Sequence, residues 1–213
     1  MIGAMVLLSP LLRPWYRRWG ATDGEASMAL PADDIVPHPK SEVTCAITVQ
    51  APASQIWPWF VQLGCRRAGW YSYDLLDNGG MLSAGRILPE FQQIDIGDVV
   101  KAMPKGEFGF PVAIVDPCRA LCLAGVLDTK TGKPVDPHGS MPEAYFAGDQ
   151  TFALHEIDAR TTRMIFRMRT DWNSSFFNNL GMRYFLEPIS FVMMRKTLIN
   201  IKQRAEKFAG WAG

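Results

Sequence analysis

The sequence lacks the residue patterns by which many catalytic and metal-binding proteins are identified. Its four cysteines form no Cys-x-x-Cys pair and its three histidines are scattered, so no zinc site with the usual ligand spacing is predicted. It contains no Gly-x-Ser-x-Gly, no phosphate-binding loop, no dinucleotide fingerprint and no His-Glu-x-x-His. These absences exclude the common hydrolase, nucleotide-binding and zinc-peptidase signatures, and we expect neither a metal nor a cofactor.

The sequence also lacks an excess of charge of either sign. Its formal net charge is +1, and no basic stripe lies among aromatic residues beyond the N-terminal segment. Binding to a nucleic acid backbone depends on clustered Lys and Arg side chains. We therefore expect no nucleic-acid partner.

A disulfide framework is not indicated either. Cys118 and Cys122 lie in an apolar run typical of a strand, where four residues span about 13 Å. This separation is too large for a disulfide or for a shared zinc ion. We expect four unpaired thiols in a reducing, cytoplasmic compartment.

No apolar run near the N-terminus is long enough to cross a bilayer as a helix, which needs about 20 residues. Residues 1–12 (MIGAMVLLSPLL) are uncharged, and the positive charges of Arg13, Arg17 and Arg18 follow them, whereas a signal peptide carries its charge first. Two interpretations stay open. Either this segment packs against the domain, or residues 1–19 contact a membrane peripherally, with Trp and Arg at the headgroup level.

The sequence does have the composition of one globular domain. Its 213 residues are 48% hydrophobic and 20% charged, enough apolar residues for a sizeable core. Residues 20–42 are rich in Pro, Asp, Ala and Gly, and three prolines oppose a regular helix there. We expect an N-terminal segment and extended linker over residues 1–42 and one ligand-binding domain over residues 43–210.

The pattern of the domain predicts an α+β fold. Residues 43–49 alternate as a strand does, and two short helices are expected at 51–63 and 70–77. Apolar residues then recur three and four apart from 188 to 208, which predicts a long amphipathic helix. Further strands are expected at about 98–103, 110–116, 120–126, 149–157 and 162–170, with a long loop over 128–148. This order favours a helix-grip arrangement, in which a curved antiparallel sheet of six to seven strands wraps around the C-terminal helix and leaves a cavity.

The densest group of polar and aromatic side chains lies in residues 64–74 (GCRRAGWYSYD). Tyr and Trp combine a large apolar area with a polar group that needs a partner. In one interpretation Arg66 grips a ligand carboxylate or phenolate, and Tyr71, Tyr73 and Asp74 supply acid–base groups. In the other, Arg66 is a solvated loop charge, Asp74 pairs with an arginine, and the rings fill the core.

Glu187 is the third candidate for acid–base chemistry, beside Tyr73 and Asp74. It precedes the long helix and extends its apolar stripe with a carboxylate. If it is buried in the cavity, its pKa should be raised. The alternative, which we favour, is a structural ion pair with Arg66, Arg86 or Arg183.

The expected cavity wall is apolar, with arginines at its rim. On the strand at 162–170, Met164, Phe166 and Met168 alternate with Arg167 and Arg169, so the apolar set should face the cavity and the arginines water. Flexible methionines favour a binding cavity over a rigid catalytic one. The residues expected to line the cavity are Trp57, Phe60, Arg66, Trp70, Tyr71, Tyr73, Arg86, Phe152, Met164, Phe166, Met168, Phe191, Met194 and Leu198.

Several stretches resemble the START/Bet v 1-like superfamily (SRPBCC), also called the polyketide cyclase/dehydrase and lipid-transport superfamily, and in particular a bacterial branch of it. They are residues 13–23 (RPWYRRWGATD), 47–52 with 56–59, 69–74 (GWYSYD), and 187–188 with 191–193. The resemblance implies a helix-grip fold with a deep cavity for a lipid-like or polyketide-like molecule. It leaves the activity open, because carriers, cyclases and regulators share this fold. We expect hydrophobic-ligand binding; the alternatives are a cyclase- or dehydratase-type enzyme and a membrane-associated lipid-handling protein.

Overall fold

The computed structural model describes residues 11–104 and 109–209. In this part of the chain, seven strands form one antiparallel sheet. Along the sheet the order is β1-β7-β6-β4-β3-β2, and β5 pairs with β4. The strands are β1 (Ser41–Val49), β2 (Val99–Lys101), β3 (Gly109–Asp116), β4 (Ala120–Asp128), β5 (Pro134–Val135), β6 (Tyr145–Asp158) and β7 (Thr161–Trp172).

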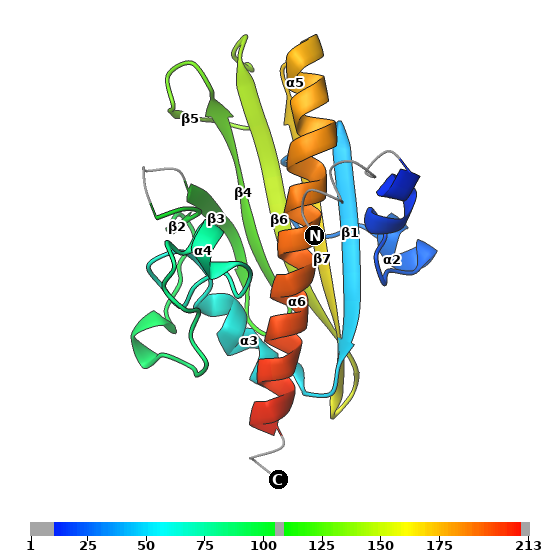
Figure 1. The fold of residues 1–213 in the computed structure, drawn as a ribbon, viewed down its shortest axis with the longest axis vertical. Coiled ribbons are helices and arrows are strands. Elements are labelled where there is room, and N and C mark those ends of the chain that lie inside the picture. Colours follow the sequence, from blue (N-terminus) through cyan, green and yellow to red (C-terminus); the bar gives the residue numbers. More distant parts are fainter. Residues whose placement is uncertain (1–10, 105–108, 210–213) are drawn as a thin grey trace.

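A long helix, α6 (Glu187–Ala209), lies across one face of this sheet (Figure 1). Its apolar stripe packs into the main core, where Phe191, Leu198, Ile201 and Ala205 are buried. The expected helix-grip α+β fold is therefore confirmed, with the C-terminal helix gripped by the sheet. In the described part of the chain, no helix is both long enough and apolar enough to cross a bilayer.

The face of the sheet beneath α6, here called the inner face, carries most of the core. Strand alternation puts Phe152 of β6 and Phe166 of β7 on this face, as the pattern predicted for Met164 and Phe166. The rings of Phe60, Phe152 and Phe166 pack in a row at tilted angles, with centroids 5.3 and 5.0 Å apart. Burial of these three rings stabilises the sheet–helix interface, because it removes a large apolar area from water.

Two short helices support one end of the sheet, as expected, but the second is shorter than predicted. They are α3 (Ala53–Val61) and α4 (Asp74–Asp77), followed by a 3-10 turn, η1 (Pro89–Phe91). Residues 70–73 are not helical, because Tyr71 adopts a positive φ of 56°. Gly64 and Gly69 close the turn before them by exchanging two backbone hydrogen bonds. Gly64 has a φ of 120°, and a Cβ there would lie 2.6 Å from Val100 Cγ1, so only glycine fits.

The opposite face of the sheet, the outer face, is covered by residues 20–42. The expectation of an extended linker without helix is corrected here: α2 (Asp23–Ser27) begins with a capping box between Thr22 and Glu25. Leu30, Ala32 and Val36 are buried against small and branched residues of β1, β4, β6 and β7. We call residues 20–42 the strap, because they run over the outer face and seal it.

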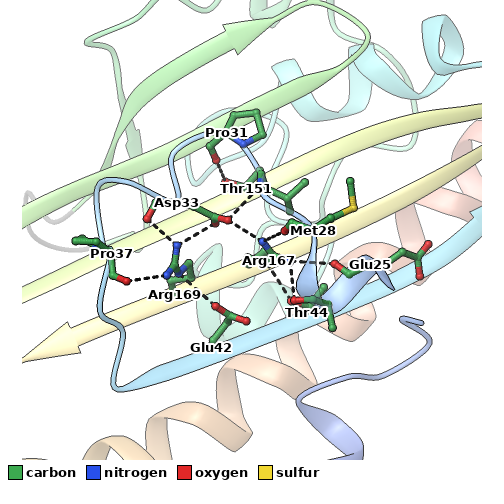
Figure 2. A network of polar contacts seen from close by, with 12 residues as sticks. Glu25, Met28, Pro31, Asp33, Pro37, Glu42, Thr44, Thr151, Arg167 and Arg169 are labelled. Carbon is green, nitrogen blue, oxygen red and sulfur yellow. Dashed lines mark hydrogen bonds and ion pairs between the residues drawn. The ribbon is translucent and has the colours of Figure 1, made fainter. Parts of the chain in front are cut away.

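The strap changes the environment of the β7 arginines, which were predicted to face water. They do point away from the cavity, but Arg167 is buried, with 2% of its surface exposed. Its guanidinium donates to the carbonyls of Glu25, Ala26 and Met28, to Asp33 Oδ2 and to Thr44 Oγ1, at 2.7 to 3.1 Å (Figure 2). Arg169 donates to the carbonyls of Asp33 and Pro37 and pairs with Glu42. Buried arginines thus hold the strap on the sheet.

Two further regions differ from the sequence expectation. The loop predicted over 128–148 contains β5 and the first residues of β6, which begins at Tyr145. Between β7 and α6, the chain forms a helix, α5 (Phe176–Gly181), and a π-helical turn, η2 (Met182–Leu186). Neither was predicted: Phe177, Leu180 and Tyr184 do recur three and four residues apart, but Met182, Phe185 and Leu186 lie off this stripe and obscure it.

Candidate functional site

A cavity lies between the inner face and the first turn of α6. Its volume is about 150 Å³. The sheet contributes Ser41 from β1, Met168 and Thr170 from β7, and Gln150 from β6, while the helical side contributes Met182, Leu186, Glu187 and Ser190. The cavity therefore occupies the place that the helix-grip arrangement predicts, at the N-terminal end of α6.

Two more open hollows adjoin this cavity. One, of about 360 Å³, lies over β3 and β4, and the other, of about 470 Å³, lies beside α5 and η2. Phe146 lines all three, Phe110 and Gly148 join the first to the second, and Met182 and Leu186 join the first to the third. Sites for small ligands usually measure about 300–1,000 Å³. The three hollows together are large enough for a ligand, whereas the cavity of about 150 Å³ alone is small.

The wall of this space is mainly apolar. Aromatic and aliphatic side chains dominate it, and Ser41, Gln150, Thr170 and Ser190 add neutral hydrogen-bonding groups. Asp149 also borders the cavity, but strand alternation places its side chain on the outer face with that of Thr151, which donates to the Pro31 carbonyl under the strap. Glu187 is thus the carboxylate on the inner face at this cavity.

All acceptor positions of Glu187 are occupied by protein donors. Arg13 Nε donates to Oε1 at 2.9 Å and Arg13 Nη2 to Oε2 at 3.1 Å. Tyr16 Oη donates to Oε1 at 2.8 Å, and Ser41 Oγ donates to Oε2. A carboxylate offers about four lone-pair sites, so none is left for a ligand. Glu187 therefore acts as the attachment point of the N-terminal helical turn, residues 11–16.

The ion pair favoured for Glu187 exists, but its partner is Arg13 and not Arg66, Arg86 or Arg183. The expected rise in pKa is also wrong. Burial alone would raise the pKa of Glu187, but the hydrogen bonds from Arg13, Ser41 and Tyr16 outweigh burial and hold it below its ordinary value. The same contact and burial raise the pKa of Tyr16 above its usual range. An ionised carboxylate in a saturated site is a poor proton donor.

Most of the predicted cavity-lining residues lie deeper, in the packed core. Met168 lines the cavity, as does the catalytic candidate Glu187. Trp57, Tyr73 and Met194 are half-buried and pack against the main core cluster. The fully buried members of that cluster are Phe60, Trp70, Tyr71, Phe152, Met164, Phe166, Phe191 and Leu198. The rings of Phe60, Phe152 and Phe166 thus fill the sheet–helix interface beyond the cavity, whereas Phe191 lies one turn after Glu187 and packs on Tyr16.

The corner formed by residues 64–74 reaches the cavity wall through Trp70, whose ring meets that of the cavity-lining Phe110 edge to face at 6.0 Å, whereas Tyr71 lies farther along α6. Asn200 of α6 donates to the Tyr71 carbonyl, and Asn200 is 13 residues after Glu187, about 20 Å along the helix. The Tyr71 hydroxyl accepts from Gln62 Nε2, and burial raises the pKa of Tyr71 to about 12. Asp74 accepts from Ser83 Oγ, so its observed partner is a hydroxyl and not an arginine. The structure does not bring Tyr71 and Glu187 together around one ligand atom.

The two predicted rim arginines, Arg66 and Arg86, are exposed at this same corner. Arg66 donates to the Pro104 carbonyl, and the backbone carbonyl of Arg86 accepts from Gln62. The neighbouring Arg67 is half-buried and donates to the carbonyls of Val61, Phe91 and Gln93. The guanidinium groups of Arg66 and Arg67 thus hold loops together, and the ligand-binding role of Arg66 and Arg86 stays a prediction.

The residues that donate hydrogen bonds to Glu187 were not predicted from the sequence. Arg13, Tyr16 and Ser41 come from a segment about 150 to 170 residues away in sequence. The available signal was the stretch RPWYRR, which combines arginines and aromatics next to an apolar run. Its Tyr16 is fully buried and stacks on Phe191, with ring centroids 5.4 Å apart.

The fold and the cavity together define a helix-grip α+β protein with an apolar space between the sheet and its C-terminal helix. No protein-family model matches the sequence, and no curated protein does. Solved structures match at low identity. One from Nitrosomonas europaea is 11% identical, with 84% of this chain and 99% of that one covered and a TM-score of 0.46. One from Mesorhizobium loti is 14% identical (78% and 98% covered, TM-score 0.45), and the Zhui aromatase/cyclase from a Streptomyces species is 16% identical (81% and 98% covered, TM-score 0.37).

Proposed function

We propose that this protein binds a hydrophobic small molecule, of lipid-like or polyketide-like character, in the space between the sheet and α6, as a member of the START/Bet v 1-like superfamily. The observation that supports this most is the apolar cavity of about 150 Å³ and the two adjacent hollows that share its lining residues. Apolar surface in such a concave site favours an apolar ligand, because transfer from water releases about 25 cal/mol per Å² of buried area.

The polar groups of the wall narrow the chemistry of the ligand. Ser41, Gln150, Thr170 and Ser190 are neutral, and the Glu187 carboxylate is saturated by protein donors. A charged ligand would be buried here without a counter-ion, at a high free-energy cost. We infer a neutral ligand with few hydroxyl or carbonyl groups, oriented by these four residues.

The arrangement of polar groups favours binding over catalysis. An acid–base enzyme needs two titratable groups within reach of one ligand atom. At this cavity, within residues 11–104 and 109–209, the inner face presents Glu187 as its carboxylate, and that carboxylate is held ionised by Arg13. A cyclase- or dehydratase-type reaction would therefore have to rely on positioning the ligand alone.

Native mass spectrometry of protein purified without detergent tests this proposal. We expect a 1:1 adduct of a neutral apolar compound that denaturation releases. A matched titration adds back a neutral apolar fluorophore, N-phenyl-1-naphthylamine, to protein stripped of ligand. Absence of an adduct, together with absence of saturable fluorophore binding, would contradict the proposal.

A further inference from the structure

The helical turn between β7 and α6 exposes a continuous group of large apolar side chains. We call it the α5–η2 patch, and its members are Phe176, Phe177, Leu180, Tyr184, Phe185 and Leu186. Phe176 and Phe177 are 75% and 80% exposed, and their rings contact each other edge to face at 5.6 Å. With roughly 200 Å² per aromatic side chain, the three phenylalanines alone leave about 400 Å² in water. A patch of this size marks an interaction surface.

The patch adjoins the mouth of the proposed site. Phe177, Phe185 and Leu186 are exposed and also line the outermost hollow of about 470 Å³. A rigid protein seated on the patch would block this mouth, whereas a lipid phase would leave it open to an apolar ligand. This point rests on the proposed function; the exposure of the patch does not.

The charges near the patch are mainly positive; Glu42, which lines the same hollow as Arg17, is paired with Arg169. Between Trp172 and Leu186, Arg183 is the one charged residue in the sequence, and it is exposed without an ion pair among the described residues. On the adjoining N-terminal turn, Arg13, Arg17 and Arg18 line an open hollow of about 510 Å³. Arg13 and Arg18 are paired with Glu187 and Asp23, whereas Arg17 bonds a backbone carbonyl. Cations beside an apolar surface complement an anionic bilayer.

We propose that the α5–η2 patch docks the protein on an anionic lipid bilayer. The phenylalanines enter the boundary between headgroups and acyl chains, while Arg183 and Arg17 face lipid phosphates. The cavity mouth then opens toward the acyl-chain region. Peripheral contact had been expected through residues 1–19 alone; this proposal places it on a different segment, with the arginines of residues 13–18 in a supporting role.

Vesicle flotation of the full chain tests the proposal, with phosphatidylcholine vesicles that contain or lack phosphatidylglycerol. The variant F176S/L180S changes patch residues outside the hollows, and L75S/L82S changes two apolar residues that are more exposed than these, at another corner. We expect wild type and L75S/L82S to float alike, and the partition coefficient of F176S/L180S to be about tenfold lower. Phosphatidylglycerol should increase the partition coefficient of wild type, and this increase should be about fivefold smaller for R183Q.

Three results would overturn it. Wild type that stays at the bottom of the gradient excludes docking by any segment, and equal flotation of F176S/L180S and wild type assigns docking elsewhere. If light scattering shows that F176S/L180S instead converts a dimer into a monomer, without a change in flotation, the patch is a contact between copies. Fluorophore binding in buffer without vesicles is expected to be the same for F176S/L180S and wild type, so failure of docking stays distinguishable from failure of ligand binding.

Discussion

Replacement of Arg167 by methionine tests how the strap is held on the sheet. Methionine roughly preserves the apolar stem but removes the guanidinium, which donates to three strap carbonyls, to Asp33 and to Thr44. Each lost hydrogen bond to a charged group costs about 1.5–3 kcal/mol in isolation, but losses in one network overlap. Because Asp33 also keeps a contact with Arg169, we expect R167M to lower the free energy of unfolding by about 3–5 kcal/mol.

Urea unfolding measures this loss, and hydrogen exchange of the amides of residues 25–37 reports whether the strap itself loosens. The matched control is R160M, since Arg160 is exposed in the β6–β7 turn and should change stability by less than about 0.5 kcal/mol. If R167M does not fold, R167K can replace it in the measurement. Lysine keeps the positive charge but lacks the planar guanidinium, so R167K should lose less stability than is expected for R167M. A loss below about 1 kcal/mol in R167M, with unchanged strap exchange, would refute the role given to Arg167.

Two further predictions concern buried carboxylates. E187Q should lower stability by about 2–4 kcal/mol at neutral pH, because Arg13 loses its buried partner. The pKa of Glu187 is held below its ordinary value of 4.5, so the stability that the ionised carboxylate contributes is present above that pH and is lost as the pH falls. The free energies of unfolding of wild type and E187Q should therefore converge in acid. Asp149 is buried with both oxygens unbonded, and burial raises its pKa to about 8. Wild type should therefore lose stability as the pH rises from about 4 to about 8, by up to about 1.4 kcal/mol per unit, whereas D149N should not; parallel pH profiles from urea unfolding would contradict this assignment.

Much of the fold could be predicted from the sequence, because strand alternation and helical spacing are patterns within single elements. The alternation of Met164, Phe166 and Met168 and the stripe from Phe191 to Ala205 each identify a buried face within one element. The same alternation put Arg167 on the opposite face correctly, but it carries no information about what covers that face. The strap was therefore missed as a layer.

The candidate site was less predictable, for two physical reasons. The partner of Glu187 is Arg13, 174 residues earlier, and such pairings depend on the assembled fold and not on local pattern. Sequence also does not tell which aromatic residues fill a cavity and which leave it open. Phe60, Phe152 and Phe166 pack against one another, so the open space lies beside Met182 and Leu186, toward the N-terminal end of α6.

Titration of wild type, S190W and Q203W with N-phenyl-1-naphthylamine tests the central claim most directly. Ser190 lines the cavity of about 150 Å³, and a tryptophan side chain there adds a volume comparable to the cavity itself, whereas Gln203 is exposed on the same helix. We expect wild type and Q203W to bind one fluorophore with the same affinity and S190W to bind at least tenfold more weakly, with the circular dichroism of all three unchanged. Equal binding by S190W and wild type would contradict the placement of the ligand between the sheet and α6.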